Sequence, residues 1–302
     1  MKKKPDKSRV DNYTSVSLQY SKRSQIVDIW QRLKKNKGAL IGLIIITIIL
    51  LMALYALLFI DYNSVIAMNM SERMQGPSLR HPFGTDESGR DLFLRVVYGS
   101  QYSVVIGIGS VAISLIIGLS LGSLAGYYGG LVDDCISRAS DVLASIPSSL
   151  LGMVIVTVLG QSLTNLVIAV SVTAMPAFIR MSRSSVMTVR SQEYVEAAKA
   201  IGMSNAKIIF AQVVPNGLSP VIVTTTARMG GSIIEAAALS FLGFGVPVPR
   251  PEWGALVSAG RIHIRTSGYL TFFPGIMIMI VVLAFNLMGD GLRDALDPKL
   301  KR

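Results

Sequence analysis

The hydrophobic positions of this chain fall into long, uninterrupted runs rather than the short alternations of a soluble core. The clearest run covers residues 39–60, which contain no charged side chain. A helix needs about 20 apolar residues to cross the hydrocarbon core of a bilayer. The run therefore predicts a first membrane-spanning helix, because a buried helix of a soluble domain does not need that length.

Five further apolar runs bring the predicted number of spans to six. Glycines recur inside the second run, a pattern that favours close packing between membrane helices. Pro147 and Pro176 interrupt the third and fourth runs, which membrane helices tolerate when neighbouring groups satisfy the freed carbonyls. The runs cover residues 102–125, 142–160, 165–181, 217–240 and 269–289, and the glycines are Gly107, Gly109, Gly118 and Gly122.

The distribution of charge predicts the orientation. Residues 2–37 hold eleven Lys or Arg against three Asp, and such an excess beside a first span marks the cytoplasmic side. Arg180, Arg183 and Arg190 follow the fourth run, so a fourth crossing is needed to return the chain to the cytoplasm. Both termini are then cytoplasmic. The acidic residues of the expected inner loop at 126–141 run against this pattern, but acids carry little weight in the rule.

These boundaries divide the chain into five expected parts. Apolar residues at helical spacing over 25–37 predict an amphipathic helix on the inner membrane face. A simple helical extension of the first span fits that spacing equally well. The parts are a basic cytoplasmic tail at 1–38, the first span at 39–60, an extracytoplasmic loop with an interfacial helix at 61–101, a five-helix core at 102–289, and a cytoplasmic tail at 290–302.

The residues of the two long extracytoplasmic segments are expected to have mainly structural roles. Asp86 or Asp91 is expected to cap a helix start, because a short polar side chain can accept from free backbone N–H groups there. The apolar residues at 92–97 are expected to form the interfacial helix. The second segment, at 241–268, contains three stiffening prolines (247, 249 and 251) and Trp253, which suits the membrane interface.

Composition narrows the possible functions. The chain is 51% hydrophobic and 16% charged, whereas soluble domains carry about a quarter charged residues. Its net charge of +11 lies largely beside the first span, where it suits anionic lipid headgroups rather than nucleic acid. Cys135 is the single cysteine, so neither an internal disulfide nor a cysteine metal site is possible. His81 and His263 stand alone, without the spacing of metal ligands.

A polar insert at 191–215 separates the fourth and fifth spans on the cytoplasmic side. Gly202 permits a left-handed residue and a sharp turn in the middle of it. Ser204 is expected to cap a second helix at 205–212, and Pro215 to end that helix before the fifth span. The first helix has an apolar face of Tyr194, Ala197, Ala198 and Ile201, with Glu193, Glu196 and Lys199 on the polar remainder.

Two charges lie inside the fifth apolar run. Arg228 and Glu235 are seven positions apart, so they share one helical face. Charged residues within membrane helices are costly and face the protein interior or a wet path. One interpretation places both along a translocation path or gate. The other places Glu235 near the outer headgroups and Arg228 at a subunit seam, and the sequence does not decide between them.

Six strings occur in a fixed order along the chain. They are HPFGTDESGRD at 81–91, GYYGG at 126–130, the insert from 193 to 216 with its Glu-Ala-Ala pattern, EAAALSFLGFG at 235–245, PEWG at 251–254 and AFNLMGDGLRDALDP at 284–298. Together they resemble the permease subunits of the dipeptide, oligopeptide and nickel ABC importers, over about residues 25–302. The single long first span and the Gly84-Thr85-Asp86 string resemble the "C"-type subunit. Val214 stands where that family commonly has leucine, which keeps the position apolar.

The resemblance implies the architecture of a type I ABC importer permease in the bacterial plasma membrane. It implies a second homologous permease as heterodimer partner, two ATPase subunits that bind ATP and magnesium, and an extracytoplasmic substrate-binding protein that docks near 241–268, unless that segment only caps the bundle. The insert would then enter a groove on an ATPase. The coupling residues implied are Glu193, Tyr194, Glu196, Ala197, Ala198, Lys199, Gly202, Met203, Ser204 and Pro215.

The remaining function classes fit less well. No glycine-rich loop ending in Gly-Lys-Ser or Gly-Lys-Thr occurs, so the chain lacks the usual phosphate cradle and is expected to take its energy from a partner. An ion-coupled secondary transporter predicts inverted repeats, which the sequence lacks. A membrane enzyme predicts paired carboxylates, a metal cluster or a nucleophile with its base, and none lies in the spans. The resemblance gives peptide as the first expected substrate and nickel or a metal chelate as the second.

Overall fold

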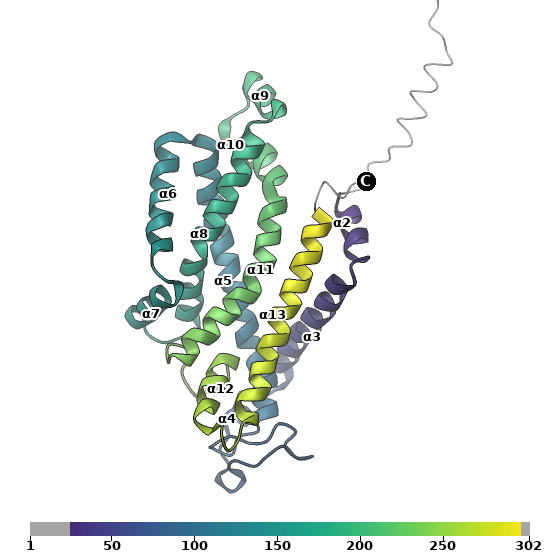
Figure 1. Ribbon diagram of the computed structural model, residues 1–302, viewed down its shortest axis with the longest axis vertical. Helices are drawn as coiled ribbons and strands as arrows, with labels where there is room; N and C mark the ends of the chain where they lie inside the picture. The colour runs from purple at the N-terminus through teal and green to yellow at the C-terminus, as the bar shows by residue number, and fades with distance from the viewer. Residues whose placement is uncertain (1–24, 297–302) are drawn as a thin grey trace, which may run out of the picture.

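A computed structural model describes residues 25–296 as a bundle of helices, with no strand in that range (Figure 1). The predictions for residues 1–24 and 297–302 concern parts of the chain outside the described residues. The long helices are α3 (Lys37–Phe59), α5 (Leu92–Tyr128), α6 (Gly130–Ser145), α7 (Ser148–Leu159), α8 (Leu163–Arg190), α11 (Val214–Phe241) and α13 (Tyr269–Leu296). The short ones are α2 (Gln25–Leu33), α4 (Tyr62–Ile66), α9 (Glu193–Ala200), α10 (Asn205–Ile208) and α12 (Trp253–Gly260).

Six membrane crossings fit this bundle. Five helices are long and apolar enough to span a bilayer, namely α3, α5, α8, α13 and the continuous run from α10 through α11. Helices α6 and α7, which meet at an angle of 92°, give the sixth crossing when the pair is counted as one broken span. Pro147 lies at this break, and Ile146 before it is extended, as a residue preceding proline prefers.

Several predicted boundaries were wrong. The expected inner loop at 126–141 is helical, since α5 runs through Tyr128 and α6 starts at Gly130. The expected interfacial helix does not exist separately, because residues 92–97 form the first turns of α5. The expected tail at 290–302 is also helical through Leu296.

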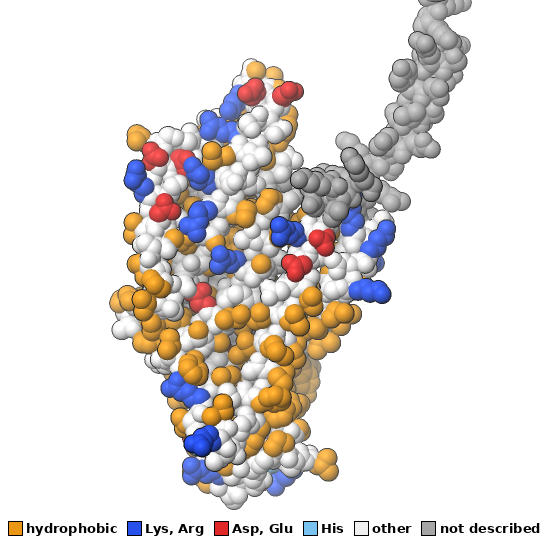
Figure 2. All heavy atoms as spheres, viewed as in Figure 1, with side chains coloured by type: hydrophobic (Ala, Val, Ile, Leu, Met, Phe, Trp, Pro, Cys, Tyr) orange, Lys and Arg blue, Asp and Glu red, His pale blue; other side chains and the backbone are white. Residues whose placement is uncertain are grey.

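The two ends of the bundle differ in the elements they carry. Figure 1 shows α2, α9 and the end of α13 at one end, and α4 and α12 at the other. Following the predicted orientation, we call these the cytoplasmic and the extracytoplasmic end. Charged side chains gather towards both ends, and hydrophobic side chains predominate between them (Figure 2). Helix α2 is separate from α3, because Asn36 has an extended backbone between them and its side chain accepts from the Ala39 N–H as the N-cap of α3.

Helices α5 and α8 pack together along much of their length, through glycines at every fourth position of α5. A methyl group at Gly122 would lie 2.5 Å from the Ile179 carbonyl oxygen, and one at Gly126 would lie 2.6 Å from the Arg183 carbonyl oxygen. Gly118 meets Phe178 in the same way. These three glycines form what we call the glycine seam, which only residues without a Cβ permit.

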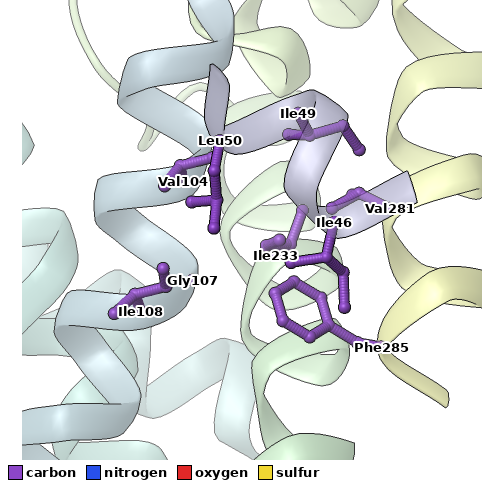
Figure 3. Close-up of a pocket in the computed structure, with 9 residues that line it drawn as sticks. All are labelled: Ile46, Ile49, Leu50, Val104, Gly107, Ile108, Ile233, Val281 and Phe285. Carbon is purple, nitrogen blue, oxygen red and sulfur yellow. The ribbon is translucent and has the colours of Figure 1, made fainter. Parts of the chain in front are cut away.

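A second contact region joins α3, α5, α11 and α13. Figure 3 shows side chains from all four helices facing one another, with Phe285 of α13 beside Ile46 of α3 and Ile233 of α11. The remaining cavity has a volume of about 10 Å³, which is at most enough for one water molecule. This region is therefore packed core, and a solute path has to lie elsewhere.

The extracytoplasmic end is held by buried polar contacts around α12. Trp253 is fully buried and its Nε1–H donates to the Val96 carbonyl at 2.9 Å, so the prediction that it lies at the membrane interface was wrong. The Glu252 carboxylate caps α12 by accepting from the N–H groups of Gly254 and Ala255, both at 2.8 Å. It also accepts from the Ser240 hydroxyl of α11 at 2.9 Å. Glu252 thus links α12 to α11.

The end of the first extracytoplasmic segment is also a folded unit. Asp91 caps α5 by accepting from the Leu94 N–H at 2.8 Å, and its other oxygen lies 2.7 Å from His81 Nδ1. Asp86 does not cap a helix, but forms ion pairs with Arg90 and Arg95. His81 therefore has a structural partner, and within residues 25–296 no three His, Cys, Asp or Glu side chains group as metal ligands.

Titration of Glu252 gives a testable pH dependence. Burial raises the pKa of this carboxyl above its ordinary value of 4.5, although its hydrogen-bond donors act in the opposite direction. The folded protein therefore holds a proton there more readily than the unfolded chain, and this contribution to stability falls as pH rises from 4.5 through the raised pKa. We expect the difference in melting temperature between the wild type and Glu252→Gln, both in detergent, to shift against the wild type as the pH rises through this range. A difference independent of pH would contradict this.

Candidate functional site: the cytoplasmic hairpin

The insert at 191–215 forms a hairpin of two short helices that projects beyond the bundle at the cytoplasmic end (Figure 1). Helix α9 ends at Ala200, and Gly202 follows with φ of +79°, so the predicted left-handed turn is confirmed. The turn is closed by the Met203 N–H, which donates to the Ala198 carbonyl at 3.1 Å. A Cβ at Gly202 would meet nothing within 4 Å, so the turn is set by backbone conformation alone.

The hairpin has its own small apolar core. Val195 and Ala198 of α9 are buried, and they pack with Tyr127 of α5 and Val186 of α8. Ile208, Ile209 and Val213 complete this cluster. The core fixes the hairpin to the ends of α5 and α8, so its position follows that of the bundle.

The predicted apolar face of α9 is divided between the inside and the outside of the hairpin. Ala198 points inward, whereas Tyr194, Ala197 and Ile201 are exposed, Ile201 to 78%. Phe210, on the π-helical turn that follows α10, is exposed to 75%. Apolar side chains at the tip of a projecting element are unusual unless a partner covers them. We call Tyr194, Ala197, Ile201 and Phe210 the exposed tip.

Tyr127 is a residue of this site that the sequence analysis missed. Its hydroxyl donates to Asn205 Oδ1 at 2.9 Å, which ties the end of α5 to the start of α10. The Lys199 ammonium lies 5.5 Å and the Arg190 guanidinium 6.0 Å from the centre of its ring. The sequence analysis placed Tyr127 in the expected inner loop at 126–141 and in a string that carries the family resemblance, and no spacing there indicates a contact 78 positions further along.

Two details of the predicted hairpin were wrong. Ser204 occupies the N-cap position of α10, but its side chain makes no capping hydrogen bond. Pro215 does not end the second helix, because α10 passes through a π-helical turn, Ile209–Val213, directly into α11. Pro215 is the second residue of α11, which directly follows the π-helical turn. A π-helical turn therefore stands where the sequence analysis expected one helix to end and the next to begin.

The polar residues of α9 remain available at its surface. Glu193 and Glu196 lie in the first turn and Lys199 in the last, which is the arrangement that the helix dipole favours. All three side chains are exposed. Met203, also among the predicted coupling residues, is half-buried under the turn.

Charges below the hairpin join α6 to α8. Both oxygens of Asp133 accept from the Arg183 guanidinium, with Nη2 to Oδ2 at 2.6 Å. Arg180 lies 3.9 Å from Asp141 at a more exposed position. The acids that weakened the predicted orientation therefore partly neutralise the arginines on the neighbouring helix.

The structure keeps Arg228 and Glu235 apart from the hairpin and places them on one face of α11. Arg228 is exposed and Glu235 is half-buried beside Thr173 of α8 and Ser148 of α7. The Glu235 Oε1 atom is buried and has no hydrogen-bond partner in the described part of the chain. The two charges therefore lie outside the packed core, on a surface of the bundle that this chain does not cover.

The fold and the hairpin define an integral membrane permease. Residues 118–302 match the family described as binding-protein-dependent transport system inner membrane component, and residues 24–77 match the N-terminal transmembrane domain of oligopeptide transport permease C. The chain belongs to this family of inner-membrane permeases of bacterial ABC importers.

Named relatives cover almost the whole chain. The dipeptide transport system permease protein DppC of Alkalihalophilus pseudofirmus is 48% identical over 94% of this chain and 93% of its own length. The di/tripeptide permease DppC of Pseudomonas aeruginosa is 41% identical over 92% and 93%. The glutathione permease GsiD of Pectobacterium atrosepticum is 38% identical over 91% of both chains.

A solved structure shows the same fold. It is the inward-facing MetNI methionine ABC transporter, which matches with a TM-score of 0.56 at 18% identity, over 68% of this chain and 98% of the other.

Replacing Tyr127 by Phe tests how the hairpin is held. The change removes the hydrogen bond to Asn205, worth about 1 kcal/mol, so the amides of α9 and α10 are expected to exchange with deuterium about fivefold faster. Tyr128→Phe is the matched control, because Tyr128 is half exposed on the adjacent position. Equal exchange in both variants would show that Tyr127 does not restrain the hairpin.

Proposed function

We propose that this chain is one transmembrane subunit of an ATP-driven importer of dipeptides and oligopeptides. It forms half of a translocation path, and the cytoplasmic hairpin couples that path to ATPase subunits. The observation that carries the proposal is the exposed tip, an apolar surface on a projecting element in a chain 48% identical to a dipeptide permease.

The geometry of the hairpin supports a mechanical role. Small residues on α9 permit close approach of a groove, and Ile201 and Phe210 offer apolar side chains to fill it. Because the hairpin core includes residues of both α5 and α8, a push on the tip acts on both helices. The chain itself then does no chemistry, and ATP and magnesium are bound by the partner subunits.

Each surface that the described chain leaves uncovered suggests one partner. A second homologous permease would cover the α11 face that carries Arg228 and Glu235, and two ATPases would each engage one hairpin. An extracytoplasmic binding protein would deliver substrate at the end that carries α12. The relatives named for dipeptides, di- and tripeptides and glutathione favour peptides over nickel or a metal chelate as the substrate.

Gly202→Val tests this coupling in the complete complex reconstituted with its binding protein. Valine at a φ of +79° strains the turn by about 1–2 kcal/mol, which shifts the hairpin population by about 5- to 30-fold. The wild type is expected to accumulate a dipeptide only with ATP. The variant is expected to insert and hydrolyse ATP, but to import several-fold less dipeptide per ATP.

Gly160→Val is the matched control. Gly160 ends α7 with φ of +89°, and a Cβ there also meets nothing within 4 Å, so valine strains the backbone at a turn far from the hairpin. It should leave the ratio of uptake to hydrolysis unchanged. A normal ratio in Gly202→Val, or an equal loss in both variants, would contradict the coupling role.

A further inference from the structure

One face of α11 has no partner within the described chain. Thr226, Gly230 and Ile233 are among the residues that bury the opposite side of the helix against α5, α8 and α13. The free face is mostly small, and it carries the two charges of the helix. Its exposed members are Ala227, Arg228, Gly231, Ile234 and Ala238, with Glu235 at its edge.

Arg228 is an unpaired charge in the middle of a membrane-spanning helix. Within residues 25–296 its guanidinium makes no hydrogen bond or close ion pair, and its one recorded interaction is the longer-range attraction to Glu235. An isolated charge is costly in hydrocarbon, so it needs water, a partner charge or a ligand. The guanidinium geometry suits a carboxylate, which it can bind with two parallel hydrogen bonds.

Glu235 is half-buried, and the described chain satisfies only part of its carboxylate. Its carboxylate interacts with the hydroxyls of Thr173 and Ser148, the latter in the first turn of α7. The buried Oε1 atom has no hydrogen-bond donor in the described chain, and the ammonium of a bound ligand would supply one.

The spacing of the two residues along α11 suits a short peptide. Seven residues of helix separate their Cα atoms by about 10.5 Å, and no ion pair within 4 Å joins them in the described chain. An extended dipeptide spans about 7 Å and a tripeptide about 10 Å. The ends of a di- or tripeptide therefore match this Cα spacing more nearly than the two ends of a free amino acid do.

We propose that Glu235 and Arg228 bind the two termini of a short zwitterionic peptide, the ammonium at Glu235 and the carboxylate at Arg228. The assignment rests on the proposed function and adds the substrate groups that this face recognises. Because α11 starts at the cytoplasmic end, Arg228 is the inner of the two charges. The peptide therefore moves inward with its carboxylate leading.

Gly231 offers a reporter position between the two charges. A Cβ there meets nothing within 4 Å, so Gly231→Cys places a thiol on the free face without displacing a neighbour. Cys135 is the single native cysteine, and Cys135→Ser provides the background. The assembled transporter, without its binding protein, is labelled with a water-soluble thiol reagent in the presence of candidate peptides. Omitting the binding protein removes its own selectivity from the measurement.

We expect a dipeptide with free termini to protect the thiol, and its N-acetylated or C-amidated forms to need about 10- to 100-fold higher concentrations. Glu235→Gln should abolish the preference for a free amino group, and Arg228→Gln the preference for a free carboxylate. A thiol at Ile116, an exposed position of α5, is the control that no peptide should protect.

The other outcomes contradict the proposal. Equal protection by blocked and free peptides, protection by a free amino acid at the same concentration, or no protection at all would each overturn it. Failure of Glu235→Gln or Arg228→Gln to assemble would assign that charge to the seam with the second permease instead. ATP-driven dipeptide uptake by the wild type, measured alongside with the binding protein, separates these results from a failure of the proposed function.

Discussion

The close approach of α5 and α8 is the constraint on which the rest of the structure depends. In a bilayer, helices gain little from burying apolar surface, so small residues that allow backbone contact decide which helices meet. Gly118, Gly122 and Gly126 provide that contact with α8. The next residue, Tyr127, then reaches Asn205, and α8 leads directly into the hairpin. A larger residue in the seam would move both supports of the hairpin at once.

The same helix ties the hairpin to the opposite end of the bundle. Near its start, the Val96 carbonyl accepts from the buried Trp253 indole, and Glu252 links α12 to the end of α11. Helix α11 in turn runs back to the hairpin through the π-helical turn. The cytoplasmic hairpin and the extracytoplasmic end are thus connected by two continuous helices, and the face of α11 with Arg228 and Glu235 lies between them. This arrangement places the candidate path beside the elements that would move.

The sequence predicted what depends on local chemistry. The apolar runs gave the spans, and Gly202 gave the left-handed turn, because each needs only the residue and its neighbours. Contacts between distant segments escaped prediction. Gly126 was assigned to an inner loop although it lies inside α5, and Trp253 to the membrane interface although it is buried. The break at Pro215 was misplaced, since a π-helical turn is not visible in residue types. The roles of the hairpin residues and of Arg228 and Glu235 remain predictions, because they involve other molecules.

The most direct test of the account asks whether a partner covers the exposed tip. Ile201→Cys in a Cys135→Ser background places the single thiol on the tip, and Leu79→Cys places one at a fully exposed position of the opposite end. Thiol labelling is compared in the permease pair alone and after the ATPase subunits are added. The account predicts that Ile201→Cys becomes protected while Leu79→Cys reacts equally in both. Unchanged labelling of Ile201→Cys in the complete complex would contradict it.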